Sequence, residues 1–386
     1  MPFDALFVPA PLREAVSDAA WLKGMLDAER ALAVAEAQAG VVPEAAAGEI
    51  AACCDAGCFD PEALAEEGRR VGNPAEPLVR ALRDAVGGDA ARYVHWGATS
   101  QDILDTAAVL VSRRAVRLVD AELEGLSAGC AGLAEAHRST VMAARTLLQQ
   151  ATPTTFGLKA AGWLMAVLDA RRGLARTELP AQLGGAAGTL AALGDKGLEV
   201  SHLYARELGL PERPLPWHTT RIPFAELGAA LAVVAGVAEK VALDVALLAQ
   251  TEVGEVREAG EGASSTMPHK RNPVGATLAR ACAVRARAGA GVLVAGLAQE
   301  HERAAGPWQA EWGALADALA FAGGAASWIR VTLDGLEVDV ERMRANVRED
   351  TLSEAKRFGL EVSDPGDYLG SAEALVDRAL AAYRET

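Results

Sequence analysis

Residues 228–250 read GAALAVVAGVAEKVALDVALLAQ, an almost unbroken run of alanine, leucine and valine. A helix that is apolar around most of its circumference has to lie inside a large core or between subunits. The run is long enough to suggest a membrane span, but Glu239, Lys240 and Asp244 interrupt it near the middle. Each such charge costs roughly 3 kcal/mol on insertion into a bilayer, so we expect a buried helix of a bundle and no membrane partner.

The same composition recurs in other long segments that contain few helix breakers. They lie at about 102–137, 155–177, 224–251 and 274–300, and each is far longer than an average helix. Connections rich in glycine and proline follow or separate them, at 180–188, 209–223 and 259–273. Functional residues often lie on loops held by a rigid scaffold, so these loops would form one cleft if they converge on the bundle.

The overall composition favours a mainly α protein. Hydrophobic residues make up 51% of the 386 residues and aromatic residues only 5%, so small aliphatic side chains fill the core, which suits close helix packing. The 37 basic and 52 acidic residues give a net charge of −15, which argues against a nucleic-acid partner or an anionic membrane surface. An anionic substrate must therefore meet a local cationic pocket.

The cysteines and glycines indicate neither a metal nor a dinucleotide cofactor. The Cys53-Cys54-x-x-x-Cys58 cluster has no second half and no nearby histidine to complete a zinc site. Gly184-Gly185-Ala186-Ala187-Gly188 follows no predicted strand, so it is not a dinucleotide-binding motif. The odd number of cysteines and the absence of a secretory signal predict reduced thiols in a cytoplasmic protein.

The pattern of breaks divides the chain into three parts. Residues 1–92 form a small N-terminal helical domain, with helices expected at 13–39, 44–56 and 61–70 before Asn73-Pro74. Residues 93–332 form the central domain of long helices. Residues 333–386 form a short C-terminal segment, with helices expected at about 337–358 and 370–384.

The connection before residue 274 contains Gly262-Ala263-Ser264-Ser265-Thr266-Met267-Pro268-His269-Lys270-Arg271-Asn272-Pro273. Asn272 suits an N-cap and Pro273 a first helical position, so the next helix would direct free N–H groups at this loop and favour an anion there. Lys270 adds a full positive charge. Ser264 and Ser265 supply hydroxyl groups that could act as base or as oxyanion donor. The alternative is a solvated turn before a capped helix.

The stretch His95-Trp96-Gly97-Ala98-Thr99-Ser100-Gln101-Asp102 immediately precedes a long predicted helix. Thr99 or Ser100 would be the N-cap, with Asp102 in the first turn, and capping alone would explain these residue types. The alternative is that the hydroxyl groups and His95 face a substrate.

Two further polar stretches lie at connections. Residues 145–159, RTLLQQATPTTFGLK, are expected to be a loop that enters a helix after Pro153, and Gln150 could bind substrate oxygens or satisfy backbone groups. Trp217-His218-Thr219-Thr220-Arg221 places a histidine near an arginine after a proline-rich connection, which fits a site or a surface loop equally.

Taken together, the stretches at 95–102, 145–159, 217–221, 262–273 and 301–312 resemble the fumarase/aspartase superfamily, in which they occur in the same order. Within it they resemble the branch that holds adenylosuccinate lyase and 3-carboxy-cis,cis-muconate cycloisomerase. The resemblance implies a mainly α fold of the fumarase/aspartase type: a central bundle of long helices, a small N-terminal helical domain and a shortened C-terminal domain. It also implies a homotetramer with sites shared between subunits.

The same resemblance implies a reaction on a small polycarboxylate without a cofactor. A base removes a proton next to a carboxylate, and an aci-carboxylate intermediate forms. By match to the family's loop, Ser264 is the base and Lys270 is catalytic, with Asn272 helping to hold the carboxylate. The expected substrate-binding residues are His95, Thr99, Ser100, Gln150, His218, Arg221, Ser265, Met267, Asn272 and Arg303.

Two positions bear on the leaving group. Relatives that release a nitrogen group carry a histidine that protonates it and a glutamate that orients the histidine, whereas this chain has Leu147 and Thr277 there. A carboxylate can leave unprotonated, because its conjugate acid has a pKa of about 4. The resemblance therefore favours a cycloisomerase that forms a muconolactone by carboxylate addition. The alternatives are a lyase that releases fumarate from a substituted succinate and a non-catalytic helical scaffold.

Overall fold

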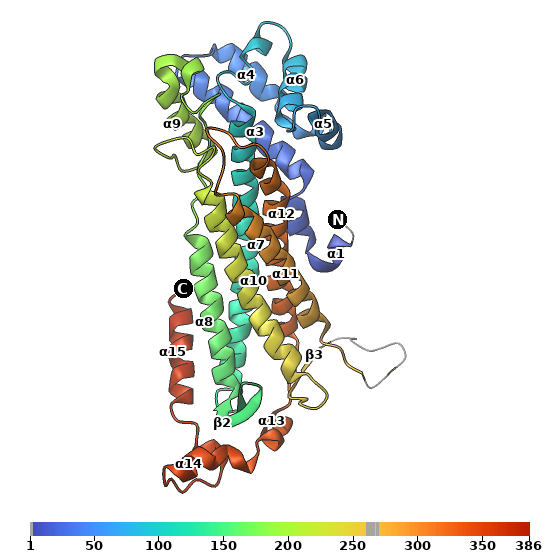
Figure 1. Cartoon of the computed structure of the whole chain (residues 1–386), viewed down its shortest axis with the longest axis vertical. Helices are drawn as coiled ribbons and strands as arrows, with labels where there is room; N and C mark the ends of the chain where they lie inside the picture. The colour runs from blue at the N-terminus through green and yellow to red at the C-terminus, as the bar shows by residue number, and fades with distance from the viewer. Residues whose placement is uncertain (1–2, 260–266, 268–269) are drawn as a thin grey trace.

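Long helices run side by side and form an elongated bundle (Figure 1). The computed structural model describes residues 3–259, 267 and 270–386. The bundle helices are α7 (Ser100–Ala136), α8 (Phe156–Ala175), α10 (Ile222–Leu248), α11 (Val274–Ala295) and α12 (Pro307–Asp334). The prediction of a mainly α protein built on a central bundle of long helices is confirmed.

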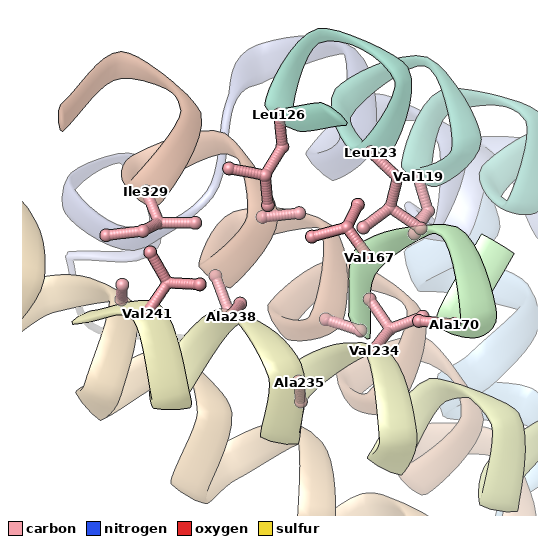
Figure 2. Packing of buried hydrophobic residues seen from close by; sticks show 14 of the residues in the cluster. Val119, Leu123, Leu126, Val167, Ala170, Val234, Ala235, Ala238, Val241 and Ile329 are labelled. Atoms are coloured by element: carbon pink, nitrogen blue, oxygen red, sulfur yellow. The ribbon is translucent and has the colours of Figure 1, made fainter. Parts of the chain in front are cut away.

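The bundle core consists of small aliphatic side chains at helical spacing. Val119, Leu123 and Leu126 lie four and three residues apart on α7, and all are fully buried. Figure 2 shows them facing Val167 of α8 and Val234 of α10 across the core. Residues with this spacing share one face of a helix. One face of the run 228–250 is therefore buried in the bundle of its own chain, and the other face stays accessible, with Val233 54% exposed.

A second hydrophobic cluster lies at the end of the bundle where α7 begins. There α3 (Asp18–Gln38) packs against α7, α4 (Glu44–Cys53) and α9 (Gly197–Leu208). The remaining elements of the N-terminal region are α1 (Asp4–Phe7), α2 (Ala10–Ala15), η1 (Ala56–Cys58), α5 (Pro61–Gly68), α6 (Ala75–Val86) and η2 (Ala90–Tyr93). The sequence patterns predict no helix at 75–86 or 197–208, where α6 and α9 lie.

The single helix predicted over 13–39 is wrong, because the chain breaks between α2 and α3. Ser17 has an extended backbone, and its side chain accepts a hydrogen bond from the backbone N–H of Ala20 at 3.2 Å. Serine is a favoured N-cap for this reason. The helix therefore begins anew at Asp18.

At the opposite end of the bundle, β1 (Val141–Thr146) and β2 (Gln149–Thr155) form an antiparallel hairpin. The prediction of a loop over this segment is wrong, because pairing continues through Pro153 and α8 begins at Phe156. The tip residues Leu147 and Leu148 have φ angles of 51° and 67° and are 96% and 77% exposed. Two consecutive positive φ angles define the type I′ turn that suits a tight hairpin.

The C-terminal segment is more broken than the sequence suggested. In place of one helix at 337–358 it forms β4 (Leu336–Val338), α13 (Val340–Asn346), η4 (Glu349–Leu352) and α14 (Ser353–Arg357). Asp339 caps α13 by accepting from the N–H of Arg342 at 2.8 Å, which starts a helix three residues after the predicted start. β4 pairs with β3 (Val256–Glu258), and the remaining elements are η3 (Ala191–Lys196), η5 (Pro365–Asp367) and α15 (Ala372–Arg384).

α15 returns along the bundle and packs against α8 (Figure 1). Among the described residues, none of the helices combines the length and apolarity needed to cross a bilayer. The divisions of the chain at residues 92 and 332 stay predictions.

Replacement of Ile329 by alanine should destabilise the bundle by about 2–5 kcal/mol, because Ile329 is fully buried between α12, α7 and α10 and the change leaves a cavity. Urea unfolding at fixed protein concentration would measure this. Val331→Ala on the same helix is the control, since Val331 is 53% exposed and should change stability by less than about 0.5 kcal/mol. Equal losses for the two variants would contradict the assigned core.

Candidate active site

The start of α7 is organised around the buried carboxylate of Asp102. One oxygen, Oδ1, lies 2.6 Å from His218 Nε2 and accepts from the N–H of Gly184 at 2.9 Å. The other accepts from the N–H groups of Thr99 and Gly185 at 3.0 and 2.9 Å. Four donors thus surround one carboxylate, which joins the predicted site stretches 95–102 and 217–221 to the glycine-rich connection at 180–188. Asp102 does more than cap the helix.

One turn further along α7, a buried ion cluster surrounds Arg221, the N-cap residue of α10. The guanidinium forms a bidentate pair with Asp105 of α7, at 2.7 and 2.9 Å, and contacts Glu311 of α12 at 2.6 Å. It also lies over the rings of Trp217 and Phe224. Burial opposes the charge of Arg221, but the two carboxylates outweigh it and raise the pKa above its ordinary value. Arg221 therefore stays a cation with both charged partners inside the protein.

Gln101 connects this ion cluster to the predicted site residues. Its amide nitrogen donates to Asp105 at 3.1 Å and to the carbonyl of His218 at 2.8 Å. Its amide oxygen lies 3.4 Å from the Arg303 guanidinium, which also donates to the carbonyl of Ala186 at 3.0 Å. Arg303 is only partly buried, so it is a cation within reach of a ligand.

His95 lies in the stretch that precedes α7, and a buried glutamate of α3 contacts one nitrogen of its ring. Its Nδ1 lies 2.6 Å from Oε1 of Glu29, a fully buried residue of α3. Burial lowers the pKa of His95, but the charge and hydrogen bond of Glu29 outweigh burial, so the pKa is raised above its ordinary value of 6.5. Ser100 is the first residue of α7 and is partly buried. We name His95, Thr99, Ser100, His218 and Arg303 the α7 group.

The start of α11 differs from the sequence prediction. The helix begins at Val274 with Pro273 as its N-cap, one residue later than expected. The N–H groups of Gly275 and Ala276 donate to the two carboxylate oxygens of Glu258 at 2.8 and 2.9 Å. The expectation of free N–H groups awaiting an anion is therefore wrong, because a side chain of β3 already provides the anion.

Other residues of the predicted loop lie beside this helix start. Ser264 and Ser265 fall outside the described residues. Lys270 is exposed and its N–H donates to the carbonyl of Met267 at 2.9 Å; the Met267 side chain is 41% exposed. Asn272 lines a cavity of about 870 Å³ formed by β3, β4, α12 and the start of α11.

Gln150 lies nearby on the hairpin, where its side chain ties β2 to the C-terminal segment. The amide nitrogen donates to the carbonyl of Asn346 at 2.8 Å, and the amide oxygen accepts from the N–H of Arg348 at 3.3 Å. Gln150 also lines a cavity of about 740 Å³ beside the hairpin. We name Gln150, Met267, Lys270 and Asn272 the hairpin-end group.

The α7 group and the hairpin-end group lie at opposite ends of the helical bundle (Figure 1). α10 alone, with 27 residues, spans about 40 Å between them at 1.5 Å per residue. A single chain therefore does not bring all the predicted site residues together. Within the described residues, no cluster of histidine, cysteine, aspartate or glutamate is arranged to hold a metal ion.

Known proteins with similar sequences show the family of this chain. A model of a lyase family matches residues 8–288. The chain belongs to this lyase family, in the fumarase/aspartase superfamily. A 3-carboxy-cis,cis-muconate cycloisomerase of Bradyrhizobium diazoefficiens is 51% identical over 347 residues, 88% of this chain and 77% of the relative. A nitrosuccinate lyase of Streptomyces davaonensis is 49% identical over 353 residues, 87% of this chain and 74% of the relative.

Solved structures of the superfamily show the same fold. The crystal structure of the 3-carboxy-cis,cis-muconate lactonizing enzyme from Pseudomonas putida has a TM-score of 0.93 and 40% identity, and it covers 100% of this chain and 99% of its own. A cycloisomerase of Pseudomonas aeruginosa, 43% identical, aligns over 440 residues, 99% of this chain and 96% of its own. That alignment is longer than this chain, so the relative contains segments that this member of the lyase family lacks.

Sequence analysis did not single out Glu29, Asp105, Glu258 or Glu311. Asp105 had a signal, since it follows Asp102 by three residues on one face of a largely apolar helix. An acid on a buried helix face must have a partner. Glu29 likewise is an acidic residue at a buried position of α3, among apolar neighbours. Nothing local to Glu258 indicates that its carboxylate caps a helix that begins 16 residues later.

Glu36 of α3 also lies in this region, and both its carboxylate oxygens are buried without a partner in the described structure. Burial and the Glu29 charge raise its pKa to about 9. Between the ordinary pKa, about 4.5, and this value, the folded state retains a proton that the unfolded state releases, so stability falls as pH rises. Glu36→Gln should remove this pH dependence, so the free energy of unfolding of the variant should rise relative to that of the wild type by about 1 kcal/mol for each unit of increasing pH.

Urea unfolding at about pH 5 and about pH 8 tests this expectation, with exposed Glu49→Gln as the control. If the difference in free energy of unfolding between Glu36→Gln and the wild type stays constant across this pH range, Glu36 is ionised in the folded protein.

Proposed function

We propose that this protein is a 3-carboxy-cis,cis-muconate cycloisomerase, which closes a muconolactone ring by intramolecular carboxylate addition to a double bond. The relatives named for this reaction carry the choice of substrate. The class of leaving group rests on the lack of a proton donor for a basic leaving group at two positions. Leu147 is at the exposed hairpin tip, and the Thr277 hydroxyl donates to the carbonyl of Pro273 at 2.7 Å. A carboxylate leaves without a proton. Several relatives, 51% and 43% identical, are named for this reaction.

In the proposed mechanism of ring closure, one substrate carboxylate adds to the double bond, Lys270 with Asn272 stabilises the aci-carboxylate that forms, and the Ser264 hydroxyl gives a proton to the carbon next to it. In ring opening, Ser264 is the base that removes this proton and the carboxylate leaves. Cationic groups lower the free energy of such a doubly charged intermediate. His95 and Arg303 of the α7 group bind further carboxylates, which gives a polycarboxylate its cationic pocket in a protein of net charge −15. Arg221 acts through the ion cluster and does not touch the substrate, because Asp105 and Glu311 occupy its donors.

A second candidate is a lyase that releases fumarate from a succinate with an acidic leaving group. The 49% identity to a nitrosuccinate lyase favours it. Nitrite, like a carboxylate, is the anion of a moderately weak acid and leaves without a proton. The Leu147 and Thr277 argument therefore fits both reactions, and only the substrate distinguishes them.

We also propose a homotetramer, because α10 and α11 carry apolar or small residues on an accessible face. On α10 the accessible positions alternate in steps of four and three residues, the spacing of a coiled-coil seam. Ile222, Ala229, Val233, Gly236, Leu243 and Leu247 are apolar or small, and Glu226 and Lys240 are charged. Val233 is 54% exposed. On α11 the same steps connect Thr277, Ala281, Val284, Ala288, Gly291 and Ala295. Two adjacent seams per chain suit a four-chain bundle.

Assembly along these seams would also complete the site. The α7 group and the hairpin-end group are about 40 Å apart in one chain. If two chains pack antiparallel, the α7 group of one chain lies beside the hairpin-end group of its neighbour. We also propose a cytoplasmic location; the cysteines in the described structure are free thiols.

Purified protein should convert 3-carboxymuconate and fail on adenylosuccinate and argininosuccinate, because neither Leu147 nor Thr277 can protonate a departing nitrogen. Ultraviolet absorbance follows each reaction, and nitrosuccinate with nitrite detection is the fourth arm. Turnover of nitrosuccinate alone would replace the cycloisomerase by the second candidate. Efficient cleavage of either nitrogen substrate would refute the leaving-group argument.

Ser264→Ala and His95→Ala should each lower turnover by about 10² to 10⁴-fold, since one loses the base and the other a group of the substrate pocket. Mixed and allowed to exchange subunits, the two inactive variants should regain partial activity, because some sites then receive an intact Ser264 and an intact His95 from different chains. A Ser264→Ala/His95→Ala chain mixed with His95→Ala is the control and should stay inactive. A monomer by light scattering would contradict the shared site.

A further inference from the structure

We propose that Glu29 is a positioning residue for His95: its carboxylate fixes the imidazole through Nδ1 and holds it as a cation, so that Nε2 is presented to a substrate carboxylate. This inference rests on the proposed function, since it assigns His95 the binding of one carboxylate of an anionic substrate. Glu29 itself reaches no substrate, because its side chain is fully buried on α3 behind the histidine.

The contact between Glu29 and His95 is short and directional. Oε1 of Glu29 lies 2.6 Å from Nδ1, although 66 residues separate the two in sequence. A charge-assisted hydrogen bond of this length fixes the ring orientation and leaves the other nitrogen free to act. Among the described residues, Nε2 has no hydrogen-bond partner, and the side chain keeps 12% of its surface accessible. One edge of the ring is thus held and the other is open.

Among the residues that the structure describes, no other cation forms an ion pair with the Glu29 carboxylate. Oε2 of Glu29 is buried and has no hydrogen-bond partner in the described structure. A buried carboxylate with one partner is costly unless that partner is charged. Protonated His95 removes this cost, so burial of Glu29 favours the imidazolium form.

Charged and titratable groups on the surrounding elements agree with this assignment. Asp102 of α7 favours the cation and Arg83 of α6 opposes it, both less strongly than Glu29. Glu36 of α3 is protonated at neutral pH because its pKa is about 9, so it does not compete as a negative charge. On α9, burial raises the pKa of Tyr204, so this phenol stays neutral as well.

The backbone at His95 is strained. Its φ angle is 61°, in the left-handed region, which costs a non-glycine residue roughly 1–2 kcal/mol. Glycine or asparagine would relieve this cost. Strained residues cluster where a side chain must be aimed for function, and the hydrogen bond to Glu29 fixes the aim here.

The main experiment measures the titration of His95 directly, without substrate. Protein labelled with ¹⁵N-histidine is titrated by NMR, and His95→Gln identifies the His95 signals. Glu29→Gln keeps the shape but loses the charge, so the pKa of His95 should fall by one unit or more. Glu29→Asp keeps the charge and should retain most of the raised pKa. Glu36→Gln is the matched control on the same helix and should change nothing.

The second experiment links this titration to ligand binding. Propane-1,2,3-tricarboxylate is the probe, and calorimetry measures its affinity from about pH 6 to about pH 9 in the same variants. Binding should weaken as pH rises through the His95 pKa, and in Glu29→Gln this loss should occur at lower pH, with roughly tenfold or more weaker binding near pH 7.5. With a turned-over substrate, the high-pH limb of kcat/KM should shift in the same direction. Circular dichroism and light scattering establish that each variant is folded.

The outcomes separate this proposal from the proposed function. An unchanged His95 titration in folded Glu29→Gln, or a pH dependence of probe binding and kcat/KM that does not shift, overturns the positioning role. If the titration and probe binding shift as expected while 3-carboxymuconate is not converted, the positioning role stands and the cycloisomerase assignment fails.

Discussion

The ion cluster of Arg221 with Asp105 and Glu311 ties three helices together at the point where the candidate site begins. Arg221 starts α10, Asp105 lies in the second turn of α7, and Glu311 lies in the first turns of α12. All three side chains are almost fully buried. Removal of one member of such a cluster costs about 3–5 kcal/mol, because the remaining charge is left without a partner. The interaction therefore fixes the relative register of the three helices, and with it Gln101, His218 and Arg303.

This arrangement explains how an acidic protein can present positive charge to a polycarboxylate. The acids nearest the site are already engaged: Asp102 accepts four hydrogen bonds, Asp105 and Glu311 are paired with Arg221, and Glu29 is paired with His95. Glu36 is protonated. The acids are thus neutralised inside the protein, while the cationic edges of His95 and Arg303 remain accessible.

The sequence predicted the elements that depend on composition and local pattern. Long aliphatic runs specified α7, α8, α10 and α11 within a few residues, because a helix of that length must bury an apolar surface. The hairpin was missed because its tip, Leu147-Leu148, lacks the glycine or asparagine that marks a type I′ turn. α12 was not assigned, although Gly306-Pro307 marks its start.

The sequence alone could not predict how the site is assembled, because the site depends on contacts between residues far apart in the chain. The expected residues lie in polar stretches of the sequence, but the direction of the helices places the described ones at two ends of the molecule, and no local pattern shows this. The carboxylates of Glu29 and Glu258 act on His95 and α11 from distant sequence positions. Chemistry predicted the need for an anion at α11, and only the fold shows that Glu258 already meets it.

α7 is one uninterrupted helix of 37 residues, about 55 Å long. It carries Asp102 and Asp105 in its first turns, and its C-cap, His137, accepts a hydrogen bond from Gly157 at the base of the hairpin. In the proposed tetramer each chain belongs to more than one site, so this rod is shared by two of them. A small tilt of a stiff rod moves both of its ends. If that assembly forms, a tilt of α7 on ligand binding at one site would also displace the other end of the helix at the second site.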